Sequence, residues 1–473
     1  MILRNDDLFE KKIDPSSFRD RSGFIFYRGT KIFRQINNVY KAVYDEFVDT
    51  GLYKELVNKN LLIEHEEVDV DNAISRDAYK VIKPQAIPFI SYPYEWCFSQ
   101  YKNSALLTLE IQRIAFNYGM TLKDASAYNI QFLDGQPILI DTLSFDKYKE
   151  GEPWVAYRQF CQHFLAPLAL MCYKDIRLSQ LMKVFIDGIP LDLASTLLPF
   201  STKTKFSLLS HIHLHSKAQD KYADKDFNQK KRKISNLGLI GIIDSLKSAV
   251  QSLKLKHKRS TWSDYYDETH YTERGFNHKK ETVSNLLDEI KDAEELWDFG
   301  SNTGEFSRIA SSKGLQTTSF DVDPFVVEKN YLNLASQGYK NILPLFCDLT
   351  NPSPNIGWEN KERLALFERG PVDIILALAL IHHLAISNNI PMYNLAKFFS
   401  AYCDHLIIEF VPKSDTKVQQ LLSTREDIFK DYTQESFENE FKKFFLFSSP
   451  VNIKDSKRSI YLMKKRHDIE KIY

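Results

Sequence analysis

The spacing of apolar residues changes along the chain, and this change predicts two different kinds of domain. Within residues 1–215, alternating apolar and polar positions predict a hairpin at Gly23–Ile36, and apolar residues three and four apart predict a helix at Ser104–Tyr118. Residues 260–473 instead alternate short apolar runs with helical patterns. That alternation is typical of an α/β domain with a mostly parallel sheet. We therefore expect an α+β domain followed by an α/β domain.

Residues 216–259 have the composition of a basic helical connector. They contain twelve Lys and Arg residues against four Asp residues. The apolar residues at helical spacing within them are Leu239, Ile243, Leu246, Val250 and Leu253. A basic amphipathic helix at 235–259 is able to make peripheral contact with a membrane. More often, such an apolar face packs on a neighbouring domain.

Overall composition narrows the class of protein. The chain has 473 residues with 62 basic and 62 acidic side chains, so its zero net charge gives no argument for a nucleic-acid partner, and we expect none. No apolar stretch reaches the ~18–20 residues of a membrane span, and the first residues lack the apolar run of a signal peptide. The five cysteines are dispersed without CxxC spacing. We expect a cytoplasmic protein, whose oligomeric state the sequence does not define.

A glycine loop follows the first apolar run of the C-terminal domain. Glu295–Phe299 predicts a strand, and a helical pattern begins at Glu305 after the intervening Gly300-Ser-Asn-Thr-Gly304. Glycines at such a turn let the backbone approach a ligand closely. By itself this spacing is a weak motif, because it lacks the full dinucleotide-binding fingerprint.

Acidic residues stand at the ends of successive predicted strands. Asp298 ends the first strand, Asp321 follows the predicted strand Leu315–Phe320, and Asp348 follows the predicted strand Asn341–Phe346. Ligands of open α/β sheets bind outside the carboxyl ends of the strands. Any one of these acids is equally consistent with an ordinary turn or helix cap. The ordered set after a glycine loop favours a nucleoside site.

The phrases LWDFGSNTGEFS, SFDVDP, LFCDLTNPSP and ALALIHHLAI resemble the successive motifs of class I S-adenosylmethionine-dependent methyltransferases. Over most of its length the chain also resembles a bacterial family of nodulation-protein-like methyltransferases, through phrases such as SYPYEW and LKDASAYNIQFLDGQPILIDTLSF. The resemblance implies a Rossmann-like domain with a seven-stranded sheet whose last strand is antiparallel. Lys443–Pro450 and Ser459–Lys464 would form the closing hairpin.

This resemblance also implies which residues bind S-adenosylmethionine. Gly300, Asn302 and Gly304 would cradle the methionine end of the cofactor. Asp298 would lie beneath them and orient the amino group of the cofactor.

The other cofactor contacts implied by the resemblance lie further along the sheet and before it. Asp321 would bind the ribose, and Asp348 would bind the adenine. The segment before the first strand often covers the cofactor in such enzymes, which makes Tyr266 and Lys280 weaker candidates. Both are also consistent with a helix surface or core.

Three residues are candidates for catalysis of methyl transfer. His382 and His383 follow the fourth strand, and a neutral histidine suits a general base. Glu409, near the end of the fifth strand, is a similar candidate. The alternative is that these side chains cap a strand or pack against the sheet.

The N-terminal domain carries a second set of chemically suggestive residues. Asp124 and Asn129 have the D-x-x-x-x-N spacing of a kinase catalytic loop, and Asp141 ends an apolar run after a predicted hairpin at Gln131–Ile140. This order resembles kinase-like phosphotransferases of the aminoglycoside and sugar kinase type. The resemblance implies that Asp124 accepts the substrate proton, while Asn129 and Asp141 hold magnesium for ATP.

The kinase resemblance has clear departures. Leu122-Lys123 replaces the usual histidine before the catalytic acid, the DFG motif reads Asp141-Thr-Leu, and no glycine-rich loop is visible. A degenerate domain that binds a substrate or supports the methyltransferase is therefore the alternative.

Taken together, these patterns predict a kinase-like domain over 1–215, a connector over 216–259 and a methyltransferase domain over 260–473. The expected function is S-adenosylmethionine-dependent methylation of a saccharide or another small molecule. Alternatives are a bifunctional kinase and methyltransferase, or a non-catalytic adaptor. The acceptor atom is not defined, because the sulfonium already activates the methyl group and no single catalytic residue is obligatory.

Overall fold

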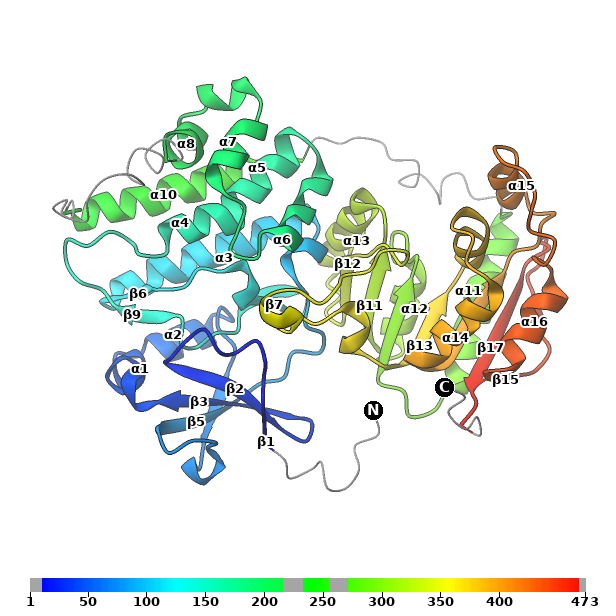
Figure 1. Cartoon of the computed structure of the whole chain (residues 1–473), viewed down its shortest axis with the longest axis horizontal. Helices are drawn as coiled ribbons and strands as arrows, with labels where there is room; N and C mark the ends of the chain where they lie inside the picture. The colour runs from blue at the N-terminus through cyan, green and yellow to red at the C-terminus, as the bar shows by residue number, and fades with distance from the viewer. Residues whose placement is uncertain (1–10, 216–232, 256–270, 468–473) are drawn as a thin grey trace. The chain divides into compact units, whose positions relative to one another are not determined.

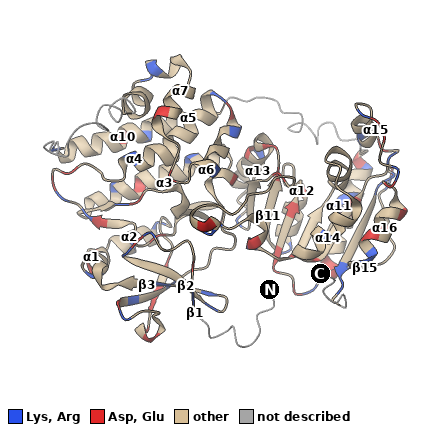
Figure 2. Cartoon of the chain, viewed as in Figure 1, with Lys and Arg blue, Asp and Glu red and all other residues tan. Residues whose placement is uncertain are grey.

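The structure is a computed structural model that describes residues 11–215, 233–255 and 271–467 (Figure 1). The chain divides into two compact units. Unit 1 comprises Met1–His257 and Asn355–Leu364, and unit 2 comprises Lys258–Pro354 and Ala365–Tyr473. Charged residues of both signs are scattered over each unit (Figure 2), as the zero net charge leads one to expect.

Unit 1 begins with a five-stranded antiparallel sheet in the order β1-β2-β3-β5-β4. Its strands are β1 (Lys11–Ile13), β2 (Gly23–Arg28), β3 (Lys31–Asn37), β4 (His65–Val68) and β5 (Ala78–Pro84). β2 and β3 form the predicted hairpin, in which Gly29 takes a φ of 56° that favours glycine at a tight turn. Helices α1 (Lys41–Asp49) and α2 (Leu52–Asn58) connect β3 to β4.

The rest of unit 1 is mostly helical, and its longest helix, α3 (Phe98–Asn117), contacts α5 and α10. Its other helices are α4 (Tyr157–Phe160), α5 (Ala166–Tyr173), α6 (Leu181–Val184), α7 (Leu191–Leu197), α8 (Phe206–Leu208) and α10 (Asn236–Ser252). Two small two-stranded sheets join β6 (Met120–Leu122) to β9 (Phe145–Lys147) and β7 (Ile130–Leu133) to β8 (Gln136–Leu139). The second is the hairpin expected at Gln131–Ile140.

The amphipathic helix of the connector is part of unit 1. α10 packs against α3, and the side chains of Leu239, Ile243, Leu246 and Val250 are buried there. Arg113 on α3 forms an ion pair with Asp244 on α10. The apolar face that suggested membrane contact through 235–259 therefore packs on protein, which was the alternative expected for such a helix.

Residues 355–364 follow strand β12 (Ile342–Phe346) of unit 2 in sequence but belong to unit 1. The Glu362 carboxylate accepts two hydrogen bonds from the Arg19 guanidinium, at 3.1 and 2.8 Å. The backbone N–H of Leu364 donates to the Tyr92 hydroxyl at 2.9 Å, and the Arg363 guanidinium lies 4.5 Å from the centre of the Tyr128 ring. These contacts attach an insertion of the α/β domain to unit 1, an arrangement that periodicity alone does not reveal.

Unit 2 contains a sheet in the order β12-β11-β10-β13-β14-β17-β15, with β16 paired to β17. The strands are β10 (Glu295–Phe299), β11 (Gln316–Asp321), β12 (Ile342–Phe346), β13 (Val372–Ala377), β14 (Cys403–Phe410), β15 (Phe445–Phe447), β16 (Val451–Asn452) and β17 (Ser459–Lys465). β10 to β14 are parallel, and β17 runs antiparallel to β14. This confirms the expected Rossmann-like domain with an antiparallel closing strand, to which the two-residue β16 is an addition.

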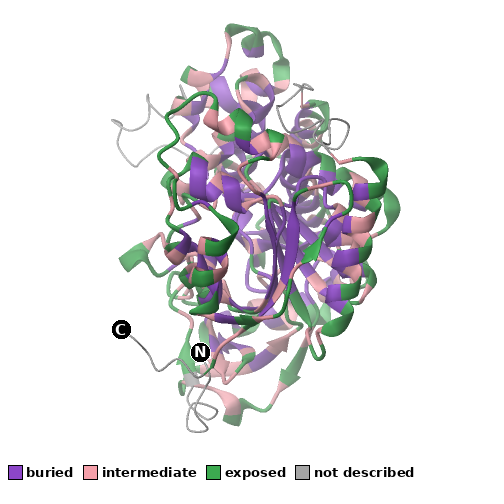
Figure 3. Ribbon diagram, turned by 90° about the vertical axis from the view of Figure 1, so that its right-hand side faces the viewer, coloured by how far each residue is buried: buried purple, intermediate pink, exposed green. Residues whose placement is uncertain are grey.

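Helices cover this sheet and bury its strands (Figure 3). They are α11 (Glu273–Glu289), α12 (Glu305–Ser312), α13 (Pro324–Gln337), α14 (Met392–Tyr402), α15 (Thr416–Leu422) and α16 (Gln434–Lys442). On one face, Leu286 of α11 and Phe306 of α12 join a core cluster with Leu296, Ile374 and Ile407. Because side chains alternate along a strand, Asp298 and Glu409 point to the same face as Leu296 and Ile407. Among the described helices, none combines the length and apolarity that a membrane span requires.

Candidate functional site

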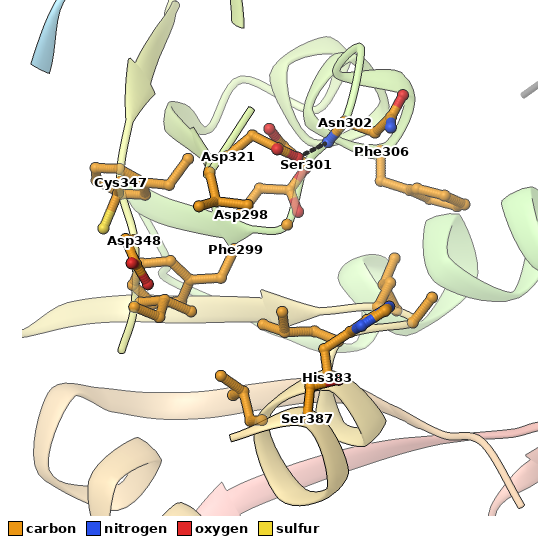
Figure 4. A pocket seen from close by; sticks show the side chains of 18 of the residues that line it. Asp298, Phe299, Ser301, Asn302, Phe306, Asp321, Cys347, Asp348, His383 and Ser387 are labelled. Atoms are coloured by element: carbon orange, nitrogen blue, oxygen red, sulfur yellow. Dashed lines mark hydrogen bonds between the residues drawn. The ribbon is translucent and has the colours of Figure 1, made fainter. Parts of the chain in front are cut away.

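A cavity of about 460 Å³ opens at the carboxyl ends of the parallel strands in unit 2. Figure 4 shows Asp298 and Asp321 beside the glycine loop, Asp348 next to Cys347, and His383 across the pocket. The lining includes Tyr271, Phe276, Lys279, Asp298, Gly300, Ser301, Asn302, Phe306, Asp321, Asp348, Thr350, Leu380, His383, Leu384, Ser387, Asn388 and Leu421. The volume lies within the roughly 300–1,000 Å³ of small-molecule sites. The sheet thus brings the predicted strand-end acids to one cavity.

The glycine loop takes its shape from left-handed backbone conformations. Gly300 and Asn302 have φ angles of 72° and 49°, and the N–H groups of Gly300 and Ser301 donate to the Phe320 carbonyl at 2.9 and 3.0 Å. Gly304 also has a positive φ, of 78°, but it is not among the residues that line the pocket. A Cβ there would clash with the side chain of Asn330, so both backbone conformation and packing favour glycine.

Asp321 is fixed by the loop that it supports. Its Oδ2 accepts a hydrogen bond from the N–H of Asn302, and its Oδ1 accepts one from the N–H of Asp323, each at 2.9 Å. Burial nevertheless raises the pKa of Asp321 to about 6. Among the described residues, no lysine or arginine forms an ion pair with this carboxylate, which lines the pocket and is able to accept hydrogen bonds from hydroxyl or cationic groups.

Asp298 and Asp348 occupy different surroundings. Asp298 is buried at the end of β10, where its Oδ2 accepts the Ser307 hydroxyl at 2.6 Å. Burial first, and then the nearby charge of Asp321, raise the pKa of Asp298 to about 6. Asp348 is half-buried, and its Oδ1 accepts from the N–H and hydroxyl of Thr350 at 2.9 and 2.7 Å.

Lys279 lines the pocket, although sequence reasoning selected its neighbour. Its ammonium donates to Glu409 Oε2 at 2.6 Å and lies 5.0 Å from the centre of the Phe306 ring. Lys280 is not part of the lining, and its Nζ lies 3.5 Å from Glu305 Oε1. Neighbouring residues of a helix point about 100° apart, so only one of the two lysines is able to face the pocket. The sequence pattern of this segment was too weak to tell which one. Tyr266 lies outside the described residues.

The structure places Glu409 behind the pocket instead of at its edge. It is fully buried, and Tyr271 donates its hydroxyl hydrogen to Oε1. Arg458 lies 3.6 Å from the same oxygen and pairs with Asp415 at 2.7 Å. Burial opposes ionisation, but Lys279 and Arg458 together lower the pKa of Glu409. Glu409 is thus an ionised partner of two cations, which does not suit it to accept a proton from a substrate.

The two histidines after β13 separate in role. His383 lines the pocket, and burial lowers its pKa to about 4, so the imidazole is neutral near pH 7. His382 is 1% exposed, does not line the pocket, and has its ring centre 4.2 Å from that of His383. Only His383 is placed to touch a ligand.

In unit 1 the kinase-like residues lie close together around one serine. Asn129 Nδ2 donates to Ser144 Oγ at 3.2 Å, and that hydroxyl donates to Asp141 Oδ2 at 2.6 Å. Asp124 accepts from the N–H of Ser126 at 2.9 Å. Burial, followed by the charge of Asp141, raises the pKa of Asp124.

Arg34 of β3 changes the electrostatics of this cluster. Its guanidinium forms an ion pair with Asp141, and both side chains are largely buried. The spacing that selected Asp124, Asn129 and Asp141 gave no sign of this cation, which lies about a hundred residues earlier. No group of three or more His, Cys, Asp or Glu side chains in the described part of the chain is arranged to hold a metal ion.

Comparison with known proteins gives one extensive relative. The nodulation protein NoeA of Rhizobium meliloti (strain 1021) is 32% identical over 460 residues, which cover 95% of each chain. Among solved structures, the N-methyltransferase NodS of Bradyrhizobium japonicum WM9 matches 41% of this chain and 97% of its own, at 11% identity and a TM-score of 0.30.

The magnesium protoporphyrin IX methyltransferase of Synechocystis, with bound SAH, matches 43% of this chain and 93% of its own, at 14% identity and a TM-score of 0.29. TM-scores this low do not establish a common fold, so the fold assignment rests on the strand order. No family model matches the chain. The relationship across 95% of both sequences shows that the chain belongs to the family of the nodulation protein NoeA.

Proposed function

We propose that unit 2 transfers a methyl group from S-adenosylmethionine to a small-molecule or saccharide acceptor. One observation carries the proposal: a left-handed glycine loop and three strand-end acids line a single cavity at the carboxyl edge of a Rossmann-like sheet. A nucleoside with a cationic side arm matches a pocket in which Asp298 and Asp321 form no ion pair with any described lysine or arginine.

The residues present fit this cofactor. Asp321 presents carboxylate oxygens beside the loop and would hold the ribose hydroxyls, and Asp348 lies on the neighbouring strand end, where it would accept from the adenine amino group. Asp298, Gly300 and Asn302 would surround the methionine end. Lys279 also lines the pocket, and its ammonium, which donates to Glu409, would donate a further hydrogen bond to the carboxylate of the cofactor.

Bound S-adenosylmethionine would supply an already activated methyl group, so this chain has to position the acceptor and accept a proton. The acceptor would bind near the segment that contributes Leu380, His383 and Leu384 to the lining. His383 is neutral at physiological pH and would take the proton that a hydroxyl acceptor loses.

Calorimetric titration of the full chain with S-adenosylmethionine tests the proposal. We expect saturable binding that Asp321→Ala weakens about 100-fold, because charged hydrogen bonds of about 1.5–3 kcal/mol are lost. Asp427→Ala is the matched control: Asp427 is an acid of unit 2 that pairs with Lys413 outside the pocket lining. Absence of binding to the wild-type chain would refute the proposal and leave a non-catalytic adaptor.

A second candidate function, ATP-dependent phosphotransfer by unit 1, is favoured by the convergence of Asn129 and Asp141 on Ser144, close to Asp124. The Arg34 ion pair weakens it, because a cation of the protein already neutralises the acid that would hold magnesium. Thermal stabilisation by ATP and magnesium that disappears in Asp141→Ala would support phosphotransfer. Equal melting temperatures with and without the nucleotide in the wild-type chain would exclude it.

A further inference from the structure

Two phenylalanines of unit 1 project into solvent from a single short segment. Phe200 begins a turn of 3-10 helix (Phe200–Thr204), and Phe206 begins α8, which packs against that turn. Their exposed fractions are 77% and 80%, compared with 67% for Trp358 and 52% for Phe18, the other exposed phenylalanine and tryptophan residues of the described chain. Two large apolar rings exposed on one short segment suggest a surface that binds a partner.

The segment is anchored from beneath, so the rings are held in this position. Thr202 is fully buried between them, and its hydroxyl donates to the Pro199 carbonyl at 2.7 Å. His213 Nε2 lies 2.9 Å from the same hydroxyl, and His213 Nδ1 lies 2.7 Å from Ser195 Oγ. Leu208 is also buried. With the inner positions fixed in the core, Phe200 and Phe206 cannot turn inward without breaking these contacts.

The segment that carries the two rings is itself basic. Lys203 and Lys205 stand between the two phenylalanines, and no Asp or Glu occurs from Leu193 to Gln219. Lys203 Nζ lies 5.4 Å from the centre of the Phe200 ring, so charge and ring lie together on the surface. This local excess contrasts with the zero net charge of the whole chain.

We propose that Phe200, Lys203, Lys205 and Phe206 form a surface that binds an anionic lipid bilayer. Projecting aromatic rings beside lysines suit an interface where rings enter the acyl boundary and ammonium groups stay at the headgroups. The anionic headgroup complements a segment without acids. This surface is distinct from helix α10, whose apolar face is covered by α3, and it does not depend on the proposed methyl transfer.

Co-sedimentation of the full chain with vesicles tests the proposal. Vesicles of phosphatidylcholine alone are compared with vesicles that also contain phosphatidylglycerol. We expect binding to the anionic vesicles that Phe200→Ser/Phe206→Ser weakens at least about tenfold, from the apolar area withdrawn from water. Lys203→Gln/Lys205→Gln should weaken it by about fivefold for each charge removed.

Ile428→Ser is the matched control, because Ile428 is 63% exposed but lies in unit 2. Phe200→Ser/Phe206→Ser and Ile428→Ser keep every basic residue of the chain, including those of 216–259, so general attraction to anionic lipid is equal in these two variants. Because the substituted side chains are exposed, we expect the melting temperatures of the variants to equal that of the wild-type chain. Equal melting temperatures exclude misfolding as the cause of weaker binding. The proposal is overturned if the wild-type chain stays in the supernatant, or if Phe200→Ser/Phe206→Ser sediments like Ile428→Ser. It is also overturned if the phenylalanines instead control self-association of the chain without vesicles.

Discussion

A sequence motif predicts a cluster of acids in each unit, but the two clusters differ in how their charges are balanced. In unit 1, Asp141 is neutralised by Arg34 and accepts the Ser144 hydroxyl. In unit 2, Asp298 and Asp321 receive hydrogen bonds but form no ion pair within the described residues, although the charge of Lys279 acts on Asp298, and burial raises the pKa of each to about 6. An acid motif therefore indicates a ligand site most strongly where the fold leaves the negative charge to be balanced from outside.

The largest expected effect is a loss of stability when the cation that pairs with a buried acid is removed, Lys279 in unit 2 or Arg34 in unit 1. Lys279→Met leaves Glu409 in a buried array with one positive charge fewer, and we expect unit 2 to lose about 3–5 kcal/mol of stability. Arg34→Met should cost unit 1 less, because Asp141 retains hydrogen bonds from Ser144 and Leu143 and is slightly more exposed. Hydrogen exchange read by mass spectrometry follows the peptides of each unit separately.

The reverse order of these two losses would contradict the comparison. It would mean that the Arg34 pair carries more of the stability than the fully buried array around Glu409. Lys280→Met is the matched control in unit 2, because it removes a lysine from the same helix that is one-third exposed and lies 3.5 Å from Glu305. A pair this exposed contributes about 0–1 kcal/mol.

Local pattern was sufficient for the strands and for the acids that end them. The strand predicted at Glu295–Phe299 is β10, whose short apolar run is bounded by a glycine loop as is typical of a buried strand. Asp298, Asp321 and Asp348 reach one cavity because parallel strands present their carboxyl ends at the same edge.

Contacts between distant residues were not predictable from the sequence. Glu409 was expected at the pocket, yet strand alternation turns it toward α11, where it meets Lys279, 130 residues earlier. Arg34 neutralises Asp141 across a similar gap. The spacing of a motif specifies neighbours along one element, whereas charge balance depends on packing between elements.

A smaller effect should appear in the pH dependence of donor binding. Asp298 and Asp321 each have a pKa of about 6, so both become protonated as the pH falls from 7.5 to 5. If each must be ionised to hold the donor, affinity should fall by about tenfold for each acid. Calorimetry across this range measures the change, and Asp298→Asn should remove about half of it. An affinity independent of pH would show that these acids do not face the donor.

The smallest effect concerns the free protein and has the opposite sign. Asp298 has a folded-state pKa above its ordinary value of 3.8, so the folded chain binds more protons than the unfolded chain between pH 3.8 and about 6. Its ionisation therefore lowers stability as the pH rises through that window, and the loss is complete above pH 6. Asp298→Asn should then stabilise unit 2 by about 1–2 kcal/mol at pH 7.5, somewhat less than a two-unit shift implies, because the Ser307 hydrogen bond is altered. Below pH 4 the gain should vanish.

Asp141→Asn in unit 1 should instead destabilise at pH 7.5, because it leaves Arg34 unpaired. Stabilisation of the pocket variant together with weaker donor binding would show that the charge is retained at a cost to folding, as expected of an acid that serves a ligand.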